Sequence, residues 1–446
     1  MAWTPPPVGD VIETVTIDGL TKCGTIDRAE ISNTKLIASY NWVEDSVPKI
    51  MVPGKPPRWT PLTQPRKLPQ DTGDFYRDIN AAAYASHPLE PAIVSIMRMN
   101  PEPMPVNLVA CGSTIGGLLR FSRGEGDTRP FRMFVEVVGD TVHLIRRENN
   151  PKELIPDVKG FGHTFPDEYT TWDGDVRRST SHQRIMMYRF AGLDMMVRFE
   201  GDGFIESPGL KQSKTPTIPR PTDNNDVLPD LSAMGIGRPV LGPRTEKSGL
   251  KVVEGGQTVS QAAVFELKTR SVRARDKDTL GEQLHRLWVS RVEQFVLAYH
   301  ERGVFNDIQI TNVKGQVKEW EDTNQSSLRR LAALLHLIMD HARETPDGKL
   351  DIVYSSGDSL EIRKQVGEDA MLSSSVQAEW ATWLGQATPM EPHSSAGSSP
   401  GSSPSARFDM DNYNFYDTYD DTYDSDEFKD FTACDKECGY CGKCEY

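Results

Sequence analysis

Residues 264–270 are a short run in which apolar and polar residues alternate at 265–268, and this run predicts a β-strand. Successive side chains of a strand point to opposite faces, so Glu266, Lys268 and Arg270 share one face and an apolar set backs them from the other. A carboxylate two residues from a lysine suits metal-dependent cleavage of a phosphodiester, because the acid binds a divalent cation and the lysine steadies the attacking water. A solvated strand face would show the same pattern.

A second alternating stretch, residues 195–202, carries two further acids, Glu200 and Asp202, on its polar face. If this strand lies beside the first, three carboxylates converge with Lys268. Like charges repel unless a cation neutralises them, so a cluster with Glu266 implies Mg²⁺ or Mn²⁺. The alternative is an exposed acidic edge that runs into a turn.

The remaining pattern predicts a mixed α/β (α+β) fold, with antiparallel-rich mixed sheets flanked by helices. Apolar runs on both sides of Gly139-Asp140, a dipeptide suited to a tight turn, predict a hairpin over residues 131–147. Short strands are expected at 11–17 and 35–40, and further hairpins at 185–199, 304–320 and 349–364. Apolar stripes with helical spacing predict helices at 279–300 and 326–342, with a short closing helix at 379–384.

The two acidic strands resemble motifs of the DXO family of RNA 5′-end decapping nucleases, which has a PD-(D/E)XK-nuclease-like core. That family carries a Glu-x-Asp strand, matched by Glu200 and Asp202, and then a Glu-hydrophobic-Lys strand, matched by Glu266 and Lys268. An earlier Gly-aromatic-Lys-Phe-Glu run is similar to residues 162–168, with one or two residues inserted. The resemblance covers roughly residues 107–317, through short motifs in the same order.

This resemblance implies a metal-dependent hydrolase that acts on the RNA 5′ end by decapping, pyrophosphohydrolysis or 5′–3′ exonucleolysis. The implied ligands of Mg²⁺ or Mn²⁺ are Glu200, Asp202, Glu266 and one of Asp167 and Glu168. Lys268 would assist the attacking water. The implied substrate-binding residues are Arg270 and Gln294, the latter expected on the helix that follows the second strand, where a structural amide is the alternative.

The chain departs from the family pattern in its first motif. The family places an arginine before a glycine there, where it meets the RNA 5′ end, but this chain has Cys111-Gly112. The substitution leaves the catalytic cluster intact and removes a residue expected to recognise a cap or triphosphate. The alternative function is therefore a noncatalytic nuclease-fold protein that binds RNA or a partner exonuclease.

Composition divides the chain into three parts. Residues 1–75 are rich in proline, which fixes φ and removes N–H donors, so an extended arm packing on the core is expected. Residues 76–390 hold the nuclease-like catalytic domain. Within it, residues 206–255 are polar and proline-rich and are expected to be a disordered insert, because they bury too little apolar surface to fold. Residues 391–446 form an acidic low-complexity tail.

The formal net charge of −14 at pH 7 does not argue against RNA as a ligand. Residues 391–446 contain 13 acidic and 4 basic residues, so the rest of the chain is only mildly acidic. A protein that grips one RNA end needs a local basic groove and not a basic domain. No apolar run is long enough to span a membrane and no secretory signal is visible, so a nuclear or cytoplasmic protein is expected, with its oligomeric state left open.

The tail ends in four closely spaced cysteines: Cys434, Cys438, Cys441 and Cys444. Disulfides are not expected in a reducing compartment. Thiolates at this spacing suit one tetrahedral Zn²⁺ ion, with an unliganded or redox-active cluster as the alternative.

Overall fold

The computed structural model describes residues 7–22, 27–76, 78–124, 130–147, 150–155, 158–206, 249–367 and 370–386. The tail at 391–446, with its four cysteines, lies outside the described residues, and so does most of the insert expected at 206–255. Within the described ranges, no helix is both long and apolar enough to cross a membrane.

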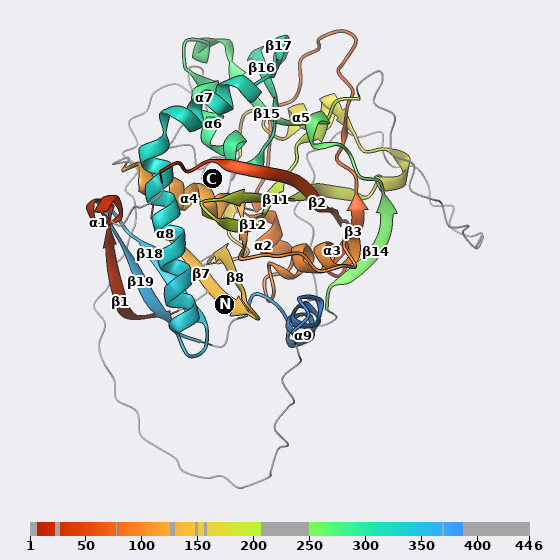
Figure 1. Cartoon of the computed structure of the whole chain (residues 1–446). Coiled ribbons are helices and arrows are strands. Elements are labelled where there is room, and N and C mark those ends of the chain that lie inside the picture. Colours follow the sequence, from red (N-terminus) through yellow and green to blue (C-terminus); the bar gives the residue numbers. More distant parts are fainter. Residues whose placement is uncertain are drawn as a thin grey trace, which may run out of the picture.

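An eleven-stranded mixed sheet forms the body of the molecule (Figure 1). In spatial order its strands are β1 (Val8–Thr16), β19 (Ser359–Gln365), β18 (Lys349–Tyr354), β7 (Phe131–Val138), β8 (Thr141–Arg146), β6 (Leu108–Cys111), β12 (Leu193–Glu200), β11 (Ser179–Phe190), β2 (Ile31–Val43), β3 (Lys49–Gly54) and β14 (Lys251–Gly256). Strand β6 is parallel to both β8 and β12, and β14 is parallel to β3. The other neighbours are antiparallel, which includes the edge pair β1 and β19.

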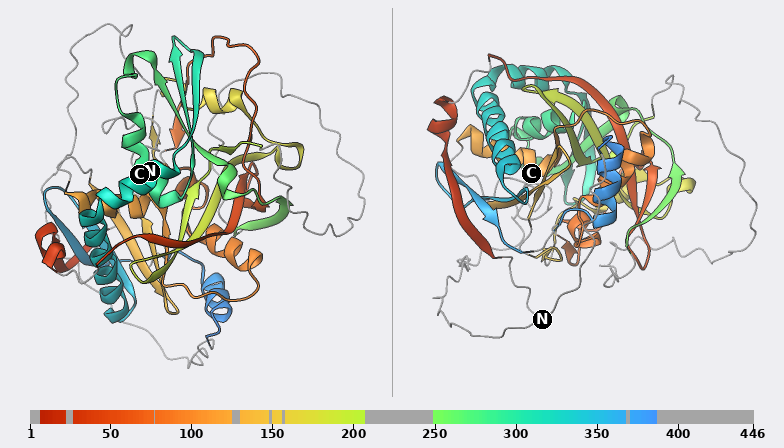
Figure 2. Two further views of the ribbon diagram at one scale, coloured as in Figure 1. Left: turned by 45° about the horizontal axis from the view of Figure 1, so that its top comes forward. Right: turned by 60° about the horizontal axis from the view of Figure 1, so that its bottom comes forward.

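A smaller six-stranded sheet lies at one end of the molecule, with α9 (Ser374–Trp383) towards the other (Figure 2). In order its strands are β10 (Thr170–Thr171), β4 (Arg58–Trp59), β13 (Gly203–Phe204), β15 (Val264–Ser271), β16 (Gln294–Glu301) and β17 (Val304–Asn312). Strands β5 (Phe75–Tyr76) and β9 (Leu154–Ile155) pair separately. Strand β15 is parallel to β16 and antiparallel to β13, so it lies inside the sheet.

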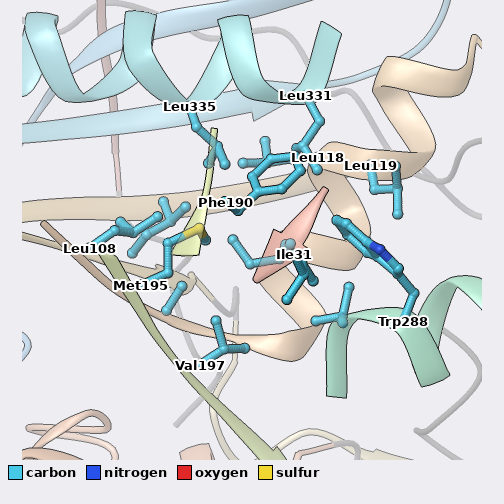
Figure 3. Close-up of a cluster of buried hydrophobic side chains, with 14 of the residues drawn as sticks. Ile31, Leu108, Leu118, Leu119, Phe190, Met195, Val197, Trp288, Leu331 and Leu335 are labelled. Atoms are coloured by element: carbon cyan, nitrogen blue, oxygen red, sulfur yellow. The ribbon is translucent and has the colours of Figure 1, made fainter. Parts of the chain in front are cut away.

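Helices cover both faces of the larger sheet because its strands alternate apolar residues between the two faces. The other helices are α1 (Ile17–Lys22), α2 (Ile79–Ala83), α3 (Glu90–Met99), α4 (Gly112–Arg123), α5 (Thr164–Tyr169), α6 (Thr279–Ser290), α7 (Lys314–Thr323) and α8 (Gln325–Glu344). Leu108 of β6 packs in the core shared with α4, α6 and α8, shown in Figure 3, whereas Val109 packs in the core shared with α3 and α9. Both residues are buried, and such burial of apolar area is the main stabilising term of the fold.

The predicted fold class is confirmed, and so are three of the predicted hairpins. Strands β7 and β8 meet at Gly139, whose φ of 62° suits the predicted turn. Strands β11 and β12 meet at Ala191-Gly192, both with positive φ. The hairpin expected at 349–364 is also present, as β18 and β19.

Two local predictions are wrong. The helix expected at 279–300 ends at Ser290, because Arg291 adopts a left-handed conformation with φ of 56° and the chain continues as β16. The hairpin expected at 304–320 is instead strand β17, paired with β16, followed by helix α7. In both places an apolar stripe alone did not distinguish a buried strand from a helix.

The first 75 residues contribute more than a surface arm, although the expected domain boundaries stay a prediction. Strand β2 pairs with β11 over most of its length and places Trp42 in the core, fully buried. Strand β3 extends the sheet through the proline-containing run around Val52, which was expected to be unpaired. Proline is tolerated there because β3 lies one strand from the edge and pairs with β2 only at two positions.

Candidate active site

The candidate site lies where the two sheets meet. Strand β12 of the larger sheet ends at Glu200, and two residues later the chain enters β13 of the smaller sheet. A Cβ at Gly203 would stand 2.4 Å from the Phe265 ring and 2.9 Å from the Pro57 carbonyl, so only glycine permits this passage. Glu200 and Asp202 are thereby held at the seam, next to β15.

Glu266 and Lys268 enter the site from β15, and both are buried. The Nζ atom of Lys268 lies 3.2 Å from Oε1 of Glu266. Helix α6 begins where the side chain of Asp278 accepts the N–H of Gly281 at 2.9 Å. This helix carries Arg286, whose Nη2 atom lies 3.1 Å from the same oxygen of Glu266. The predicted half-buried strand is therefore buried on both faces, and its acid is neutralised by two cations.

The three acids of the two predicted strands line one cavity of about 80 Å³. Glu200, Asp202 and Glu266 share it with Arg286, and one oxygen of Asp202 accepts the backbone N–H of Leu267 at 2.8 Å. The structure thus brings together three of the acids proposed from the sequence, with Lys268 beside them. Their catalytic roles stay a prediction.

Several polar atoms around this cavity lack a hydrogen bond. Across the described part of the chain, no partner is found for Nε2 of Gln183, Oγ of Ser290, or Nε and Nη1 of Arg198. Oε1 of Glu266 has its two cations within reach, but neither is aligned as a hydrogen bond. A buried polar atom without a partner is unfavourable by about 1–3 kcal/mol, so such a cluster favours a site that binds a polar ligand.

A second cavity, of about 330 Å³, adjoins the first. The residues that line both cavities are Asp78, Asn80, Cys111, Ser113 and Arg198. Its outer wall carries three basic residues, Arg146, Arg147 and Lys152. Ligand sites in proteins typically measure about 300–1,000 Å³, so the larger cavity has room for a nucleotide-sized group beside the acidic one.

Three other residues proposed from the sequence lie away from both cavities. Asp167 and Glu168 are on α5, where Glu168 forms an ion pair with Arg66. Gln294 is the first residue of β16 and not part of the preceding helix, which places Ser290 rather than Gln294 on the cavity. The expected helical position of Gln294 is therefore wrong.

Arg270 also lies outside the two cavities, although it shares the strand with Glu266. It is almost fully buried, donates to the carbonyl of Thr269 at 3.0 Å and stands 3.6 Å from Glu282. The sequence analysis did not single out Arg198 or Arg286. For Arg198 the signal was present, because it shares the polar face of the strand with Glu200 and Asp202.

The donor set fits a hard divalent cation in its chemistry, since three carboxylates face one cavity and a buried oxygen of Glu266 lacks an aligned hydrogen bond. As the side chains stand, no three acidic, histidine or cysteine residues in the described ranges are close enough to hold an ion. The guanidinium of Arg286 is nearest to Glu266 and is partly exposed, so it can move. Glu200, Asp202 and Glu266 therefore match a hard divalent cation in ligand type, and they would have to move closer together to hold one.

Comparison with solved structures identifies the fold. Rai1 of Scheffersomyces stipitis, solved with (3′-NADP)⁺ and calcium, matches with a TM-score of 0.51 and 11% identity, covering 85% of this chain and 99% of that one. S. pombe Rai1 in complex with 3′-FADP matches with a TM-score of 0.50 and 9% identity. S. pombe Rai1 without a named ligand matches with a TM-score of 0.50 and 10% identity. Each match covers 79% of this chain and 99% of the Rai1 chain.

These Rai1 structures are of the DXO family, so the structural resemblance expected from the sequence is confirmed at the level of the fold. No curated protein matches the chain. One family model does, over residues 11–367.

Proposed function

The chain belongs to the family described as "Domain of unknown function (DUF8563)", and for this protein we propose hydrolysis at the 5′ end of RNA. The observation that carries the proposal is the convergence of Glu200, Asp202 and Glu266 on one cavity, with Lys268 3.2 Å from Glu266. The two strands that supply them match the order of the acidic motifs in the resembling nucleases. The Rai1 structures of the same fold were solved with the dinucleotide ligands (3′-NADP)⁺ and 3′-FADP, which supports a nucleotide end as the substrate.

Each side chain of the cavity has a role in this proposal. Glu200, Asp202 and Glu266 would hold one or two Mg²⁺ or Mn²⁺ ions, which supply Lewis acidity towards a phosphoryl oxygen. Lys268 is buried, so its ammonium is a fixed donor that stabilises negative charge on the phosphate and orients the attacking water. A low-dielectric site makes that interaction stronger than it would be in water.

A second candidate function is binding of an RNA 5′ end without cleavage. One observation favours it: Lys268 and Arg286 lie 3.2 and 3.1 Å from Oε1 of Glu266 and together neutralise its charge. A site whose carboxylate is already neutralised has less need of a metal ion, and it binds an anion more tightly than a site with an uncompensated carboxylate. The wider alternative, docking of a partner exonuclease, stays an expectation from the sequence.

Incubation of the purified full chain with 5′-triphosphate, methyl-capped and NAD-capped RNA, each with Mg²⁺ or Mn²⁺, tests the two candidates. We expect hydrolysis of at least one of these RNAs, and a rate about 100-fold lower in Glu266→Gln, which removes one anionic ligand. Glu301→Gln is the matched control, because Glu301 is exposed at the end of β16 in the same sheet. Binding of RNA with no product in any condition would leave only the second candidate.

A further inference from the structure

Arg198 occupies the junction of the two cavities. It lies on β12 two residues before Glu200, and in the sheet it is paired with Cys111 of β6. It lines the acidic cavity and the larger one, and only 7% of its surface is exposed. Its Nε and Nη1 atoms have no hydrogen-bond partner within the described ranges.

A structural role does not account for this arrangement. The neighbouring strand supplies a comparison: Arg184 of β11 is equally buried, but it donates to Oε1 of Gln261 at 2.9 Å and to the carbonyl of Val259 at 2.8 Å. A buried guanidinium is normally satisfied in that way, because removing its charge from water is costly. Nε and Nη1 of Arg198 have no such acceptor within the described ranges.

The groups around Arg198 balance its charge only in part. Burial raises the pKa of the Cys111 thiol, and it raises that of the Tyr40 hydroxyl to about 12, so both are neutral at pH 7. The carboxylate of Asp78 is a nearby negative charge, and one of its oxygens accepts the N–H groups of Asn80 and Ala81 at 2.8 and 3.0 Å. Arg198 is therefore a positive group that lines two cavities, with two of its three nitrogen atoms lacking a hydrogen-bond partner within the described ranges.

We propose that Arg198 binds a phosphate at the 5′ end of the RNA and so sets the preference of the site for phosphorylated ends. The inference rests on the proposed function in taking RNA as the ligand. A phosphate is the anion that matches a planar fork of N–H donors in a buried site. From this position the larger cavity can receive the group attached to the phosphate, and the acidic cavity lies on the other side.

The proposal also explains how this chain can keep an arginine at the site without one at position 111. Because Arg198 and Cys111 are register partners on adjacent strands, a side chain from either position reaches the same junction. The small side chain of Cys111 lines the same two cavities as the guanidinium of Arg198.

Binding measured without cleavage tests the inference. Fluorescence anisotropy in EDTA would compare one short RNA carrying a 5′-monophosphate, a 5′-triphosphate or a 5′-hydroxyl, with inorganic phosphate and a free nucleoside monophosphate as competitors. We expect the wild-type chain to prefer the phosphorylated ends by about tenfold or more, the usual size for one charge-assisted contact. Arg198→Met should lose that preference and keep its affinity for the 5′-hydroxyl RNA.

Two controls separate binding from folding. Arg189→Met removes an exposed arginine of the neighbouring strand β11 and should leave the preference unchanged. Arg198→Met should melt at the same temperature as the wild type or higher when no ligand is present, because it removes a buried group with two unsatisfied donor atoms. If it does not fold, Arg198→Gln takes its place, with the same loss of preference expected.

The outcomes are distinct. A folded Arg198→Met or Arg198→Gln chain that still prefers phosphorylated ends overturns the inference, and so does a wild-type chain without any preference. Competition by the free nucleotide or phosphate as strongly as by the RNA would assign the site to a small anion and overturn its assignment to an RNA end. Loss of preference in a protein that cleaves no RNA would uphold the inference and reject the hydrolase.

Discussion

Glu321 and Glu266 are both buried carboxylates close to helix α6, yet their surroundings differ. Glu321 lies on α7, and its Oε2 atom accepts the N–H of Ile31 at 3.0 Å and the indole N–H of Trp288 at 2.7 Å. Its Oε1 atom lies 2.7 Å from Nζ of Lys318. Glu266 has two cations nearby but no aligned hydrogen bond to Oε1, and it faces a cavity.

The comparison distinguishes two uses of a buried charge. Both oxygens of Glu321 accept hydrogen bonds from the protein, so that carboxylate ties α7 to α6 and to β2. Oε1 of Glu266 accepts no aligned hydrogen bond and Glu266 lines the cavity, so that carboxylate is available to a substrate or a metal ion. Burial is the same in both cases, and the completeness of the hydrogen bonding is what differs.

The largest expected effect is on stability and concerns Glu321. Glu321→Leu leaves the buried donors of Ile31 and Trp288 without an acceptor and removes the partner of the exposed Lys318, so the free energy of unfolding should fall by about 3–5 kcal/mol. Urea unfolding followed by circular dichroism measures it. Glu266→Gln is the matched control and should change the same quantity by less than about 1 kcal/mol, since the amide keeps the shape of the side chain and Oε1 accepts no aligned hydrogen bond. Equal losses in the two variants would remove the distinction between them.

A smaller effect on stability tests whether a buried polar atom without a hydrogen-bond partner always indicates a ligand site. His143, on β8, is fully buried and lines neither cavity, and both its ring nitrogens lack a partner in the part of the chain described. Burial lowers its pKa from 6.5 to about 4, so the ring is neutral in the folded protein and needs no ligand. Between these two values the unfolded chain binds a proton that the native protein does not.

Stability from the neutral ring is therefore complete above pH 6.5 and is lost as the pH falls towards 4. The loss at pH 5 relative to pH 8 should be about 2 kcal/mol, and His143→Phe should remove that part of the pH dependence. Urea unfolding at both pH values, with half-buried His336→Gln as the control, measures it. An unchanged pH dependence in His143→Phe would show that another group governs acid stability.

The smallest expected effect concerns the cation that neutralises Glu266. Arg286→Leu removes the guanidinium 3.1 Å from that carboxylate, so Mn²⁺ should bind about tenfold more tightly, a difference of ~1.4 kcal/mol. Isothermal titration calorimetry on the RNA-free protein gives the affinity directly. Arg275→Gln, which breaks an exposed pair with Asp307, should leave it unchanged. Weaker binding in Arg286→Leu would mean that Arg286 supports the metal site and does not compete with it.

The sequence predicted those parts of the site that depend on strand alternation. Glu200, Asp202, Glu266 and Lys268 lie in two runs in which the charged residues are spaced two apart, and such spacing fixes which side chains share a face. It did not predict that β12 and β15 belong to different sheets, because nothing local to either strand records its distant neighbours. The seam depends on Gly203, whose requirement is set by contact with Phe265.

Residues on helices and at the ends of helices and strands were harder to predict from the sequence. The apolar stripe of α6 continues into β16, so the periodicity extended the helix past Arg291 and carried Gln294 with it. Strand β2 was underestimated because proline-rich flanks obscured it, although its apolar residues are among the most buried in the protein. Arg286 reaches Glu266 only through the packing of α6 on the sheets, which one-dimensional patterns do not contain.

The pairing of β1 with β19 sets the order of events while the chain is made on the ribosome. Thr16 pairs with Ser359 and Val8 with Gln365, so β1 leaves the exit tunnel long before its neighbour has been translated. During that interval its backbone groups are unpaired, beside apolar residues such as Val11 and Ile12, which stay exposed even after folding. Unpaired edges of this kind attract other nascent chains, and pairings so distant in sequence form slowly. Strand β1 is therefore secured only once β19 has been translated, so its unpaired edge needs the protection of a chaperone throughout that interval.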